Sequence, residues 1–323
     1  MPAVSTSICS MPRSPETVAP RAGTPGPAIA LVSDGNDWHA RALIKAFGVL
    51  GARAQVLMLP SCRFDSTAPS GLYLPGFEDG LPDAVLVRTM SGGSFEAVTL
   101  RLGLLHVLAE IGVTVWNSAR AIERCVDKSM TSFLLARAGL PTPATWVAEQ
   151  RDQAVEIVRR EKGPLVLKPL FGSQGRGLRL IHSPEELPAP DGAAGGVYYL
   201  QRFVGVERNG YHDFRVLVSA GRVVAAMMRH SAHWVTNVKR GAKPVAAVAD
   251  GVMKDLAVAA AAAVGADYAG VDVVYDRDGR PTVLEVNSMP AWSGLQKTTP
   301  VDIAAVLAGN LVAALLTRAQ RGG

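Results

Sequence analysis

Residues 165–177 constrain this chain more than any other stretch, because an apolar run there ends in a lysine and a glycine-rich loop. The run ends at Lys168, and Gly172, Gly175 and Gly177 follow it. Glycines lack a Cβ atom, so their backbone N–H groups can approach phosphate oxygens, and a lysine adds a positive charge for the same anion. The pattern predicts a strand followed by a phosphate-binding loop. An ordinary turn is the alternative, since glycine clusters also form turns.

A second informative region lies further along the chain and has the pattern of a β-hairpin. Two apolar, β-branched runs, 270–274 and 283–287, flank a polar stretch that contains glycine. Side chains alternate along a strand, so Glu285 and Asn287 share one face, and Asp272 shares it if the register allows. Carboxylate and amide oxygens are the ligands that suit Mg²⁺ or Mn²⁺. The alternative is a half-exposed hairpin whose polar residues face solvent.

Together these two regions resemble the ATP-grasp ligases, and specifically the RimK-like α-L-glutamate ligase family. The resemblance covers residues 28–316, and the order and spacing of its motifs make it specific. Besides Lys168–Pro169, 172–177, Asp272 and 284–287, the matching segments are 127–131, 139–143, 199–204, 213–216, 228–229, 236–238 and Gly241.

The N-terminal part of the chain alternates between strand-like and helix-like segments. Apolar strands are expected at 29–33, 54–59, 84–88 and 114–116, with helices at 38–50 and 95–111 between them. That alternation predicts a small parallel sheet. No G-x-G-x-x-G follows the first strand, so we expect no dinucleotide site.

For the whole chain, the resemblance implies an α/β fold in which a small parallel preATP-grasp domain precedes two α+β ATP-grasp subdomains. We expect a flexible tail at 1–27, because it is rich in Pro, Ser and Thr. The preATP-grasp domain should span 28–117, the first ATP-grasp subdomain 118–198 and the second 199–319.

The resemblance also implies an ATP site. Lys128, in the first turn of a helix that Asp127 is expected to cap, would approach the phosphates or the adenine; an exposed lysine is the alternative. Strand 197–204 would be a hinge that binds adenine, or else an ordinary core strand. The nucleotide-binding residues implied are Lys128, Lys168, Gly172, Ser173, Gln174, Gly175, Gly177, Gln201, Arg202, Phe203, Asp213 and Asn237.

The catalytic residues implied are Lys168 and Arg229, and the metal ligands are Asp272, Glu285 and Asn287, which would hold two Mg²⁺ or Mn²⁺ ions. Phosphoryl transfer depends mostly on positioning and charge neutralisation. A planar guanidinium contacts two oxygens at once, so Arg229 is suited to stabilise an acyl phosphate. Histidines His212, His230 and His233 lie near these positions, and we favour a substrate-lining role for them over a general base.

The chemistry implied is ATP-dependent ligation of a carboxylate to an amine through an acyl phosphate. L-Glutamate would be added to a small-molecule acceptor such as a coenzyme. One alternative is a ligase that activates glutamate and joins it to an amine such as tyramine. Another is a catalytically inactive nucleotide-binding regulator, against which the retention of the full metal set argues.

Composition limits the partners. The chain has 323 residues and a net charge of +5, but its Lys and Arg residues are scattered, so we expect no nucleic-acid partner. The basic residues that cluster between 215 and 243 suit an anionic small molecule. No apolar run is long enough to span a bilayer, and the cysteines, which lie far apart, fit a reducing cytoplasm. A homo-oligomer is left open.

Three departures from the family pattern fall in substrate loops. Val235 stands where RimK-like ligases usually carry arginine, and Ala242 replaces a glycine. Residues 288–292 read Ser-Met-Pro-Ala-Trp where Ser-Pro-Gly or Met-Pro-Gly is usual. The nucleotide motifs are intact, so these departures bear on the identity of the substrates.

Overall fold

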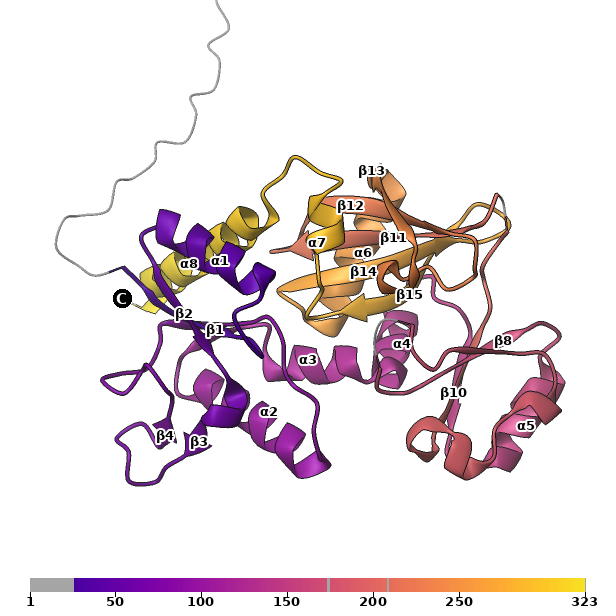
Figure 1. Cartoon of the computed structure of the whole chain (residues 1–323), viewed down its shortest axis with the longest axis horizontal. Coiled ribbons are helices and arrows are strands. Elements are labelled where there is room, and N and C mark those ends of the chain that lie inside the picture. The colour runs from indigo at the N-terminus through magenta and orange to yellow at the C-terminus, as the bar shows by residue number, and fades with distance from the viewer. Residues whose placement is uncertain (1–25, 173–174, 208, 323) are drawn as a thin grey trace, which may run out of the picture.

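Three sheets organise the chain in a computed structural model that describes residues 26–172, 175–207 and 209–322 (Figure 1). Most of the expected tail therefore lies outside the described residues. The helices are α1 (Trp38–Val49), α2 (Phe95–Glu110), α3 (Ala119–Val126), α4 (Lys128–Arg137), α5 (Arg151–Arg160), α6 (Gly251–Val264), α7 (Ser293–Gln296) and α8 (Ile303–Gly322).

The first sheet is parallel, as the βα alternation predicted. Its order is β2-β1-β5-β6, formed by β1 (Ala28–Val32), β2 (Arg53–Leu57), β5 (Ala84–Val87) and β6 (Thr114–Trp116). A short hairpin, β3 (Arg63–Phe64) with β4 (Leu72–Tyr73), lies in the β2–β5 connection.

Helices cover both faces of this sheet because both faces of its strands are apolar. Ile29, Leu31 and Leu86 share a core with α1 and α8, whereas Val32 and Val85 share another with α2 and α3. Burial on both faces is typical of a parallel sheet. Figure 1 shows α8 beside α1, so the last helix of the chain completes the N-terminal layer.

The second sheet is antiparallel and carries the glycine-rich loop. Its order is β7-β10-β8-β9, formed by β7 (Thr145–Ala148), β8 (Leu165–Lys168), β9 (Arg179–Ile181) and β10 (Tyr198–Arg202). Helix α5 packs on one face through Ala154 and Val158.

The third sheet is also antiparallel and contains the expected hairpin. Its order is β13-β12-β11-β14-β15, formed by β11 (Tyr211–Ser219), β12 (Arg222–Ser231), β13 (Lys243–Ala247), β14 (Tyr268–Tyr275) and β15 (Pro281–Asn287). Helix α6 packs on one face of it, and α4 and the end of α3 join the same core.

The expected domain limits stay a prediction, but the sheets locate some edges differently. Strand β10 runs to Arg202 and pairs with β7 and β8, so the second sheet continues past the boundary expected at 198. Helix α8, expected in the last subdomain, packs on the N-terminal domain. Within the described ranges, no helix is long and apolar enough to cross a membrane.

Candidate active site

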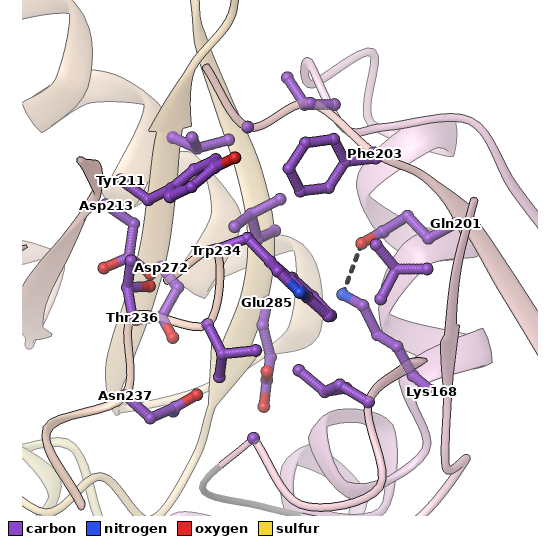
Figure 2. A pocket seen from close by; sticks show the side chains of 18 of the residues that line it. Lys168, Gln201, Phe203, Tyr211, Asp213, Trp234, Thr236, Asn237, Asp272 and Glu285 are labelled. Atoms are coloured by element: carbon purple, nitrogen blue, oxygen red, sulfur yellow. Dashed lines mark hydrogen bonds between the residues drawn. The ribbon is translucent and has the colours of Figure 1, made fainter. Parts of the chain in front are cut away.

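A large pocket lies between the second and third sheets, where most of the expected site residues meet (Figure 2). With its open mouth it encloses about 1040 Å³, at the upper end of the range for small-molecule sites. Thirteen of the expected site residues line it: Lys128, Lys168, Gly172, Gly175, Gln201, Arg202, Phe203, Asp213, Arg229, Asn237, Asp272, Glu285 and Asn287. Gly177 lies between Arg176 and Leu178, which line the pocket, and Ser173 and Gln174 lie outside the described residues.

Lys168 is held at the end of β8 by the neighbouring strand. Its Nζ donates to Oε1 of Gln201 at 2.6 Å, and the Nε2 of Gln201 in turn donates to Thr145 and Tyr199, both at 3.2 Å. Burial lowers the pKa of Lys168 to about 8; nearby Lys128 adds to that effect, and the Glu285 carboxylate opposes it. The ammonium is therefore mostly charged at neutral pH and loses its proton as the pH rises through about 8.

Lys128 is buried, so the exposed-lysine alternative is wrong. Helix α4 begins where expected, since Oδ1 of Asp127 accepts from the backbone N–H groups of Ser129 and Met130. The Nζ of Lys128 donates to the carbonyl oxygen of Gly172 at 2.7 Å. Lys128 thus fixes the start of the glycine-rich loop while lining the pocket.

The glycine-rich loop approaches the segment after β12 too closely for a side chain. Gly175 has φ +68°, and a Cβ there would lie 2.4 Å from Oδ1 of Asn237 and 2.8 Å from Cγ1 of Val235. Arg240 donates to the Gly175 carbonyl oxygen at 2.6 Å. The described part of the loop therefore packs closely against this segment at the edge of the pocket, and its phosphate-binding role stays a prediction.

The hairpin brings the three expected metal ligands to one face, as predicted. Asp272 pairs directly with Glu285 across β14 and β15, and Gly270 pairs with Asn287. All three side chains line the pocket. Within the described part of the chain, no group of three His, Cys, Asp or Glu side chains forms a metal cluster. Two carboxylates with one amide still fit Mg²⁺, which usually completes its shell with water and substrate phosphate.

Two arginines neutralise the carboxylates at the back of the pocket. Arg215 contacts Asp272 through Nε and, at 2.8 Å, through Nη2. Arg229 donates Nε to Oδ1 of Asp213 at 2.7 Å, pairs with its second oxygen through Nη2, and places the same Nη2 3.0 Å from Asp272. Burial acts to raise the pKa of Asp272, but Arg215 and Arg229 outweigh it and the pKa is lowered.

The fork of Arg229 is thus directed at Asp213 rather than left free for a phosphoryl group. Burial would lower the pKa of Arg229, but Asp272 and Asp213 raise it, so the guanidinium stays charged. Arg215 was not predicted as a site residue; the only signal was its place in a basic stretch, two positions from Asp213 on the same strand face. Its pairing with Asp272 depends on a neighbour distant in sequence.

The expected hinge lies along the pocket, but two of its N–H groups are occupied. Arg202 donates its backbone N–H to the Ala144 carbonyl at 2.8 Å, and Phe203 donates to Pro164 at 3.0 Å. The N–H groups of Arg202 and Phe203 are therefore not available to a base, and Val204, which follows them, also lines the pocket.

Aromatic side chains that were not predicted form the upper wall. The ring of Phe203 meets Trp234 edge-on at 6.0 Å between centroids and Tyr211 at 6.4 Å (Figure 2). Trp234 belongs to the loop that departs from the family pattern, so sequence motifs gave no signal for it. Of the three histidines considered, only His212 lines the pocket, and His230 contacts the Asn209 carbonyl oxygen at 2.7 Å.

This chain is similar to known proteins in both sequence and fold. The RimK-like ATP-grasp domain matches residues 125–311. The tetrahydromethanopterin:alpha-L-glutamate ligase of Methanosarcina acetivorans is 32% identical, covering 82% of this chain and 92% of that protein. The ribosomal protein bS6–L-glutamate ligase of Salmonella schwarzengrund is also 32% identical, covering 85% of this chain and 92% of that protein.

Solved structures with the same fold have lower sequence identity. The ATP-grasp ligase PsnB, complexed with a minimal precursor variant, Mg and ADP, superposes with a TM-score of 0.67 at 24% identity, covering 88% of this chain and 97% of PsnB. A RimK domain ATP-grasp protein from Sphaerobacter thermophilus gives 0.64 at 22%, covering 88% of this chain and 99% of that one. The chain is a member of the RimK-like ATP-grasp family and a ligase that forms carbon–nitrogen bonds.

Proposed function

We propose that this ligase is ADP-forming and joins L-glutamate, through its amino group, to the carboxylate of a small-molecule acceptor by way of an acyl phosphate. One observation carries the proposal. Lys168 and the glycine-rich loop form one wall of the pocket, and Asp272, Glu285 and Asn287 lie on the facing hairpin. A nucleoside triphosphate bound between them would contact positive charge on one side and oxygen ligands on the other.

The proposed chemistry assigns each group a separate task. Lys168 and the backbone of Gly172 and Gly175 hold the phosphates while an acceptor carboxylate oxygen attacks the γ-phosphorus and ADP leaves. The glutamate amine then attacks the acyl carbon, phosphate leaves, and an amide remains. Arg215 and Arg229 pair with the buried carboxylates of Asp272 and Asp213, and so they would hold Asp272 in place and reduce its repulsion of the phosphates.

Asp272, Glu285 and Asn287 are the residues that would hold Mg²⁺ or Mn²⁺. The ions, two in our proposal, would neutralise the phosphate oxygens. Asn287 donates Nδ2 to the Gly270 carbonyl at 3.4 Å, which leaves its Oδ1 as the acceptor atom for a cation. Asp272 would share its oxygens between a cation and the two arginines.

The relatives support glutamate as one substrate, and their names give two kinds of acceptor. One acts on tetrahydromethanopterin and another on ribosomal protein bS6. For this chain we propose a small molecule, because three of its relatives, at 32%, 36% and 33% identity, are tetrahydromethanopterin:alpha-L-glutamate ligases.

Hydroxylamine trapping tests the proposal and separates it from its alternatives. The enzyme is incubated with ATP, Mg²⁺ and hydroxylamine, which converts an acyl phosphate to a hydroxamate, with L-glutamate alone and with candidate acceptor acids. We expect ADP release and a hydroxamate of the acceptor acid, and none of glutamate. Glutamyl hydroxamate would show that glutamate is the activated carboxylate. Release of AMP would indicate adenylation and overturn the acyl-phosphate route.

A further inference from the structure

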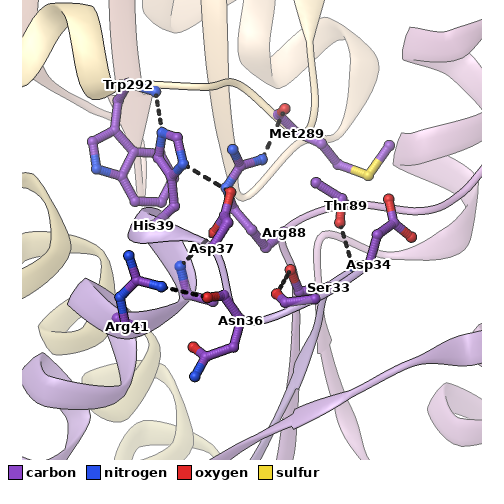
Figure 3. A network of polar contacts seen from close by, with 12 residues as sticks. Ser33, Asp34, Asn36, Asp37, His39, Arg41, Arg88, Thr89, Met289 and Trp292 are labelled. Atoms are coloured by element: carbon purple, nitrogen blue, oxygen red, sulfur yellow. Dashed lines mark hydrogen bonds and ion pairs between the residues drawn. The ribbon is translucent and has the colours of Figure 1, made fainter.

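Among the described residues, no carboxylate pairs with the buried cation Arg88 (Figure 3), which is not part of the lining of the nucleotide pocket. It directly follows β5 and is 4% exposed. Its side-chain hydrogen bond, from Nη1 to the Met289 carbonyl, is 3.5 Å long, at the weak limit for such a bond. Its guanidinium lies 5.1 Å from the centre of the Trp292 ring. A charge buried in this way is costly unless something neutralises it.

The position of Arg88 is one where parallel sheets bind ligands. Strand β1 leads through α1 to β2 on one side, and its other neighbour is β5, which leads through α2 to β6. The two helices lie on opposite faces of the sheet. The strand order therefore reverses at the carboxyl ends of β1 and β5, the place where parallel sheets commonly bind ligands. Arg88 stands at that point.

Two buried donors in this cluster have no acceptor. Among the described residues, the buried side-chain atoms without a hydrogen-bond partner are Nε of Arg88 and Nε1 of Trp292. Buried donors are normally satisfied, so a pair of exceptions in one cluster indicates a missing acceptor.

The acidic residues nearby are engaged elsewhere. Asp37 caps α1 by accepting from the backbone N–H of Ala40 at 2.8 Å and also contacts Nδ1 of His39 at 3.1 Å. Asp34 accepts from the Ser91 hydroxyl. Burial, aided by Arg88, lowers the pKa of His39, and its Nε2 accepts from the backbone N–H of Trp292 at 3.2 Å, as only a neutral imidazole can. Burial lowers the pKa of Arg88, and Asp37 and Asp34 act through space to raise it, but neither carboxylate is hydrogen-bonded to its guanidinium.

We propose that Arg88 binds a carboxylate of L-glutamate that does not take part in the reaction, with the indole of Trp292 as a wall of that subsite. The inference rests on the proposed function, in which glutamate supplies its amine and keeps both carboxylates. Met289 and Trp292 continue directly from β15, whose Glu285 and Asn287 line the nucleotide pocket. One short segment thus connects the nucleotide pocket to the Arg88 cluster, and the carboxylate would replace the weak contact to Met289.

Calorimetry with L-glutamate, in the presence of Mg²⁺ and a non-hydrolysable ATP analogue, tests the subsite. Arg88→Met removes the charge and Arg88→Lys keeps it without the fork. Losing a charge-assisted hydrogen bond should weaken glutamate binding at least about tenfold in Arg88→Met, with partial recovery in Arg88→Lys. Affinity for the ATP analogue should stay unchanged. Arg41→Met is the matched control, because Arg41 is exposed and donates to the Asn36 carbonyl at the same edge.

L-Glutamine and the α-amide of L-glutamate identify which carboxylate is bound. The ligand that lacks the recognised carboxylate should bind wild type and Arg88→Met equally. Equal losses of glutamate and nucleotide affinity in Arg88→Met would assign Arg88 to folding alone and overturn the subsite. Unchanged glutamate binding would overturn it while leaving the proposed function intact. A wild-type chain that binds no glutamate would overturn the proposed function itself.

Discussion

The Nζ of Lys168 donates to the side-chain oxygen of Gln201 at 2.6 Å, which joins the lysine before the phosphate loop to the strand of the expected adenine hinge. Both ends of a bound nucleotide would therefore contact one hydrogen-bonded pair of strands, β8 and β10. Gln201 is 1% exposed, so the pair is fixed before any ligand arrives.

The low pKa of Lys168 predicts that ATP binding takes up a proton. The folded protein holds this pKa at about 8, and bound phosphates should raise it because they favour the charged ammonium. Near and above pH 8, binding must therefore recharge Lys168, and apparent affinity should weaken as pH rises. Calorimetry at about pH 8.5, in two buffers of different ionisation enthalpy, measures the uptake. Lys168→Arg should abolish it, since arginine stays charged. Equal proton uptake in both proteins would contradict the assignment.

Glu285→Ala should reduce turnover at least about a hundredfold while leaving the protein folded, because it removes an oxygen ligand and not a core side chain. Steady-state ADP release with saturating Mg²⁺ checks the loss, and circular dichroism checks the fold. Glu185→Ala, a surface change remote from the pocket, is the control. Near-normal ADP release in Glu285→Ala would remove Glu285 from the metal site.

Arg229→Lys should lower kcat more than it raises the KM for ATP, because lysine keeps the charge but cannot reproduce the fork on Asp213. Buried Asp213 and Asp272 would retain a cation, so we expect the variant to fold. Kinetics with and without Asp213→Asn measure the coupling between the two residues. An unchanged kcat would exclude Arg229 from catalysis and leave the ligase mechanism standing.

Gly175→Ala should impair nucleotide binding, since its Cβ would collide with Asn237 and Val235. Gly279→Ala separates this collision from backbone strain, because Gly279 has φ +75° with open space around it. Both variants should lose about 1 kcal/mol of stability from the left-handed backbone. Only Gly175→Ala should weaken binding of an ATP analogue, as measured by calorimetry. If Gly175→Ala and Gly279→Ala bound the ATP analogue with equal affinity, the close approach of Gly175 to Asn237 and Val235 would be refuted.

The raised pKa of Asp267 predicts that the free energy of unfolding falls as pH rises. Burial raises its pKa from the usual 3.8 to about 7, so between these values the folded state binds a proton that the unfolded state has released. The cost of burying the ionised Asp267 carboxylate is absent in acid, grows between the two pKa values and reaches its full size above pH 7. Asp267→Asn should therefore gain about 1–2 kcal/mol above neutrality and little in acid, a range reduced for partial exposure. Urea unfolding at both ends of the window checks it, with exposed Asp79→Asn as control. A gain independent of pH would contradict the assignment.

The sequence predicted the elements whose information is local. Alternation along 270–287 placed Asp272, Glu285 and Asn287 on one face, and β14 and β15 pair as that pattern required. Asp127 predicted the start of α4 correctly, because helix capping depends on residues that are close in sequence. Both features follow from backbone geometry over a few residues.

The rest depended on tertiary neighbours. Nothing near Lys128 in the sequence indicates that its ammonium would contact the Gly172 carbonyl. The direction of the Arg229 fork is set by Asp213 on the paired strand, and Arg88 gains its importance only when Met289 and Trp292 fold against it. Trp234 lies outside the segments that match the family, so its place beside Phe203 had no sequence signal.

Because α8 packs on α1, the core of the N-terminal domain can be completed only after the end of the chain has been translated. Leu43 and Phe47 of α1 share their core with Ile303, Leu307 and Leu311 of α8, which are translated after every strand of the three sheets. While the ribosome is still making the ATP-grasp sheets, α1 can pack on the first sheet but lacks the apolar contacts that α8 provides. The nascent N-terminal domain should therefore depend on chaperones until α8 emerges, and only then acquire its full resistance to proteolysis.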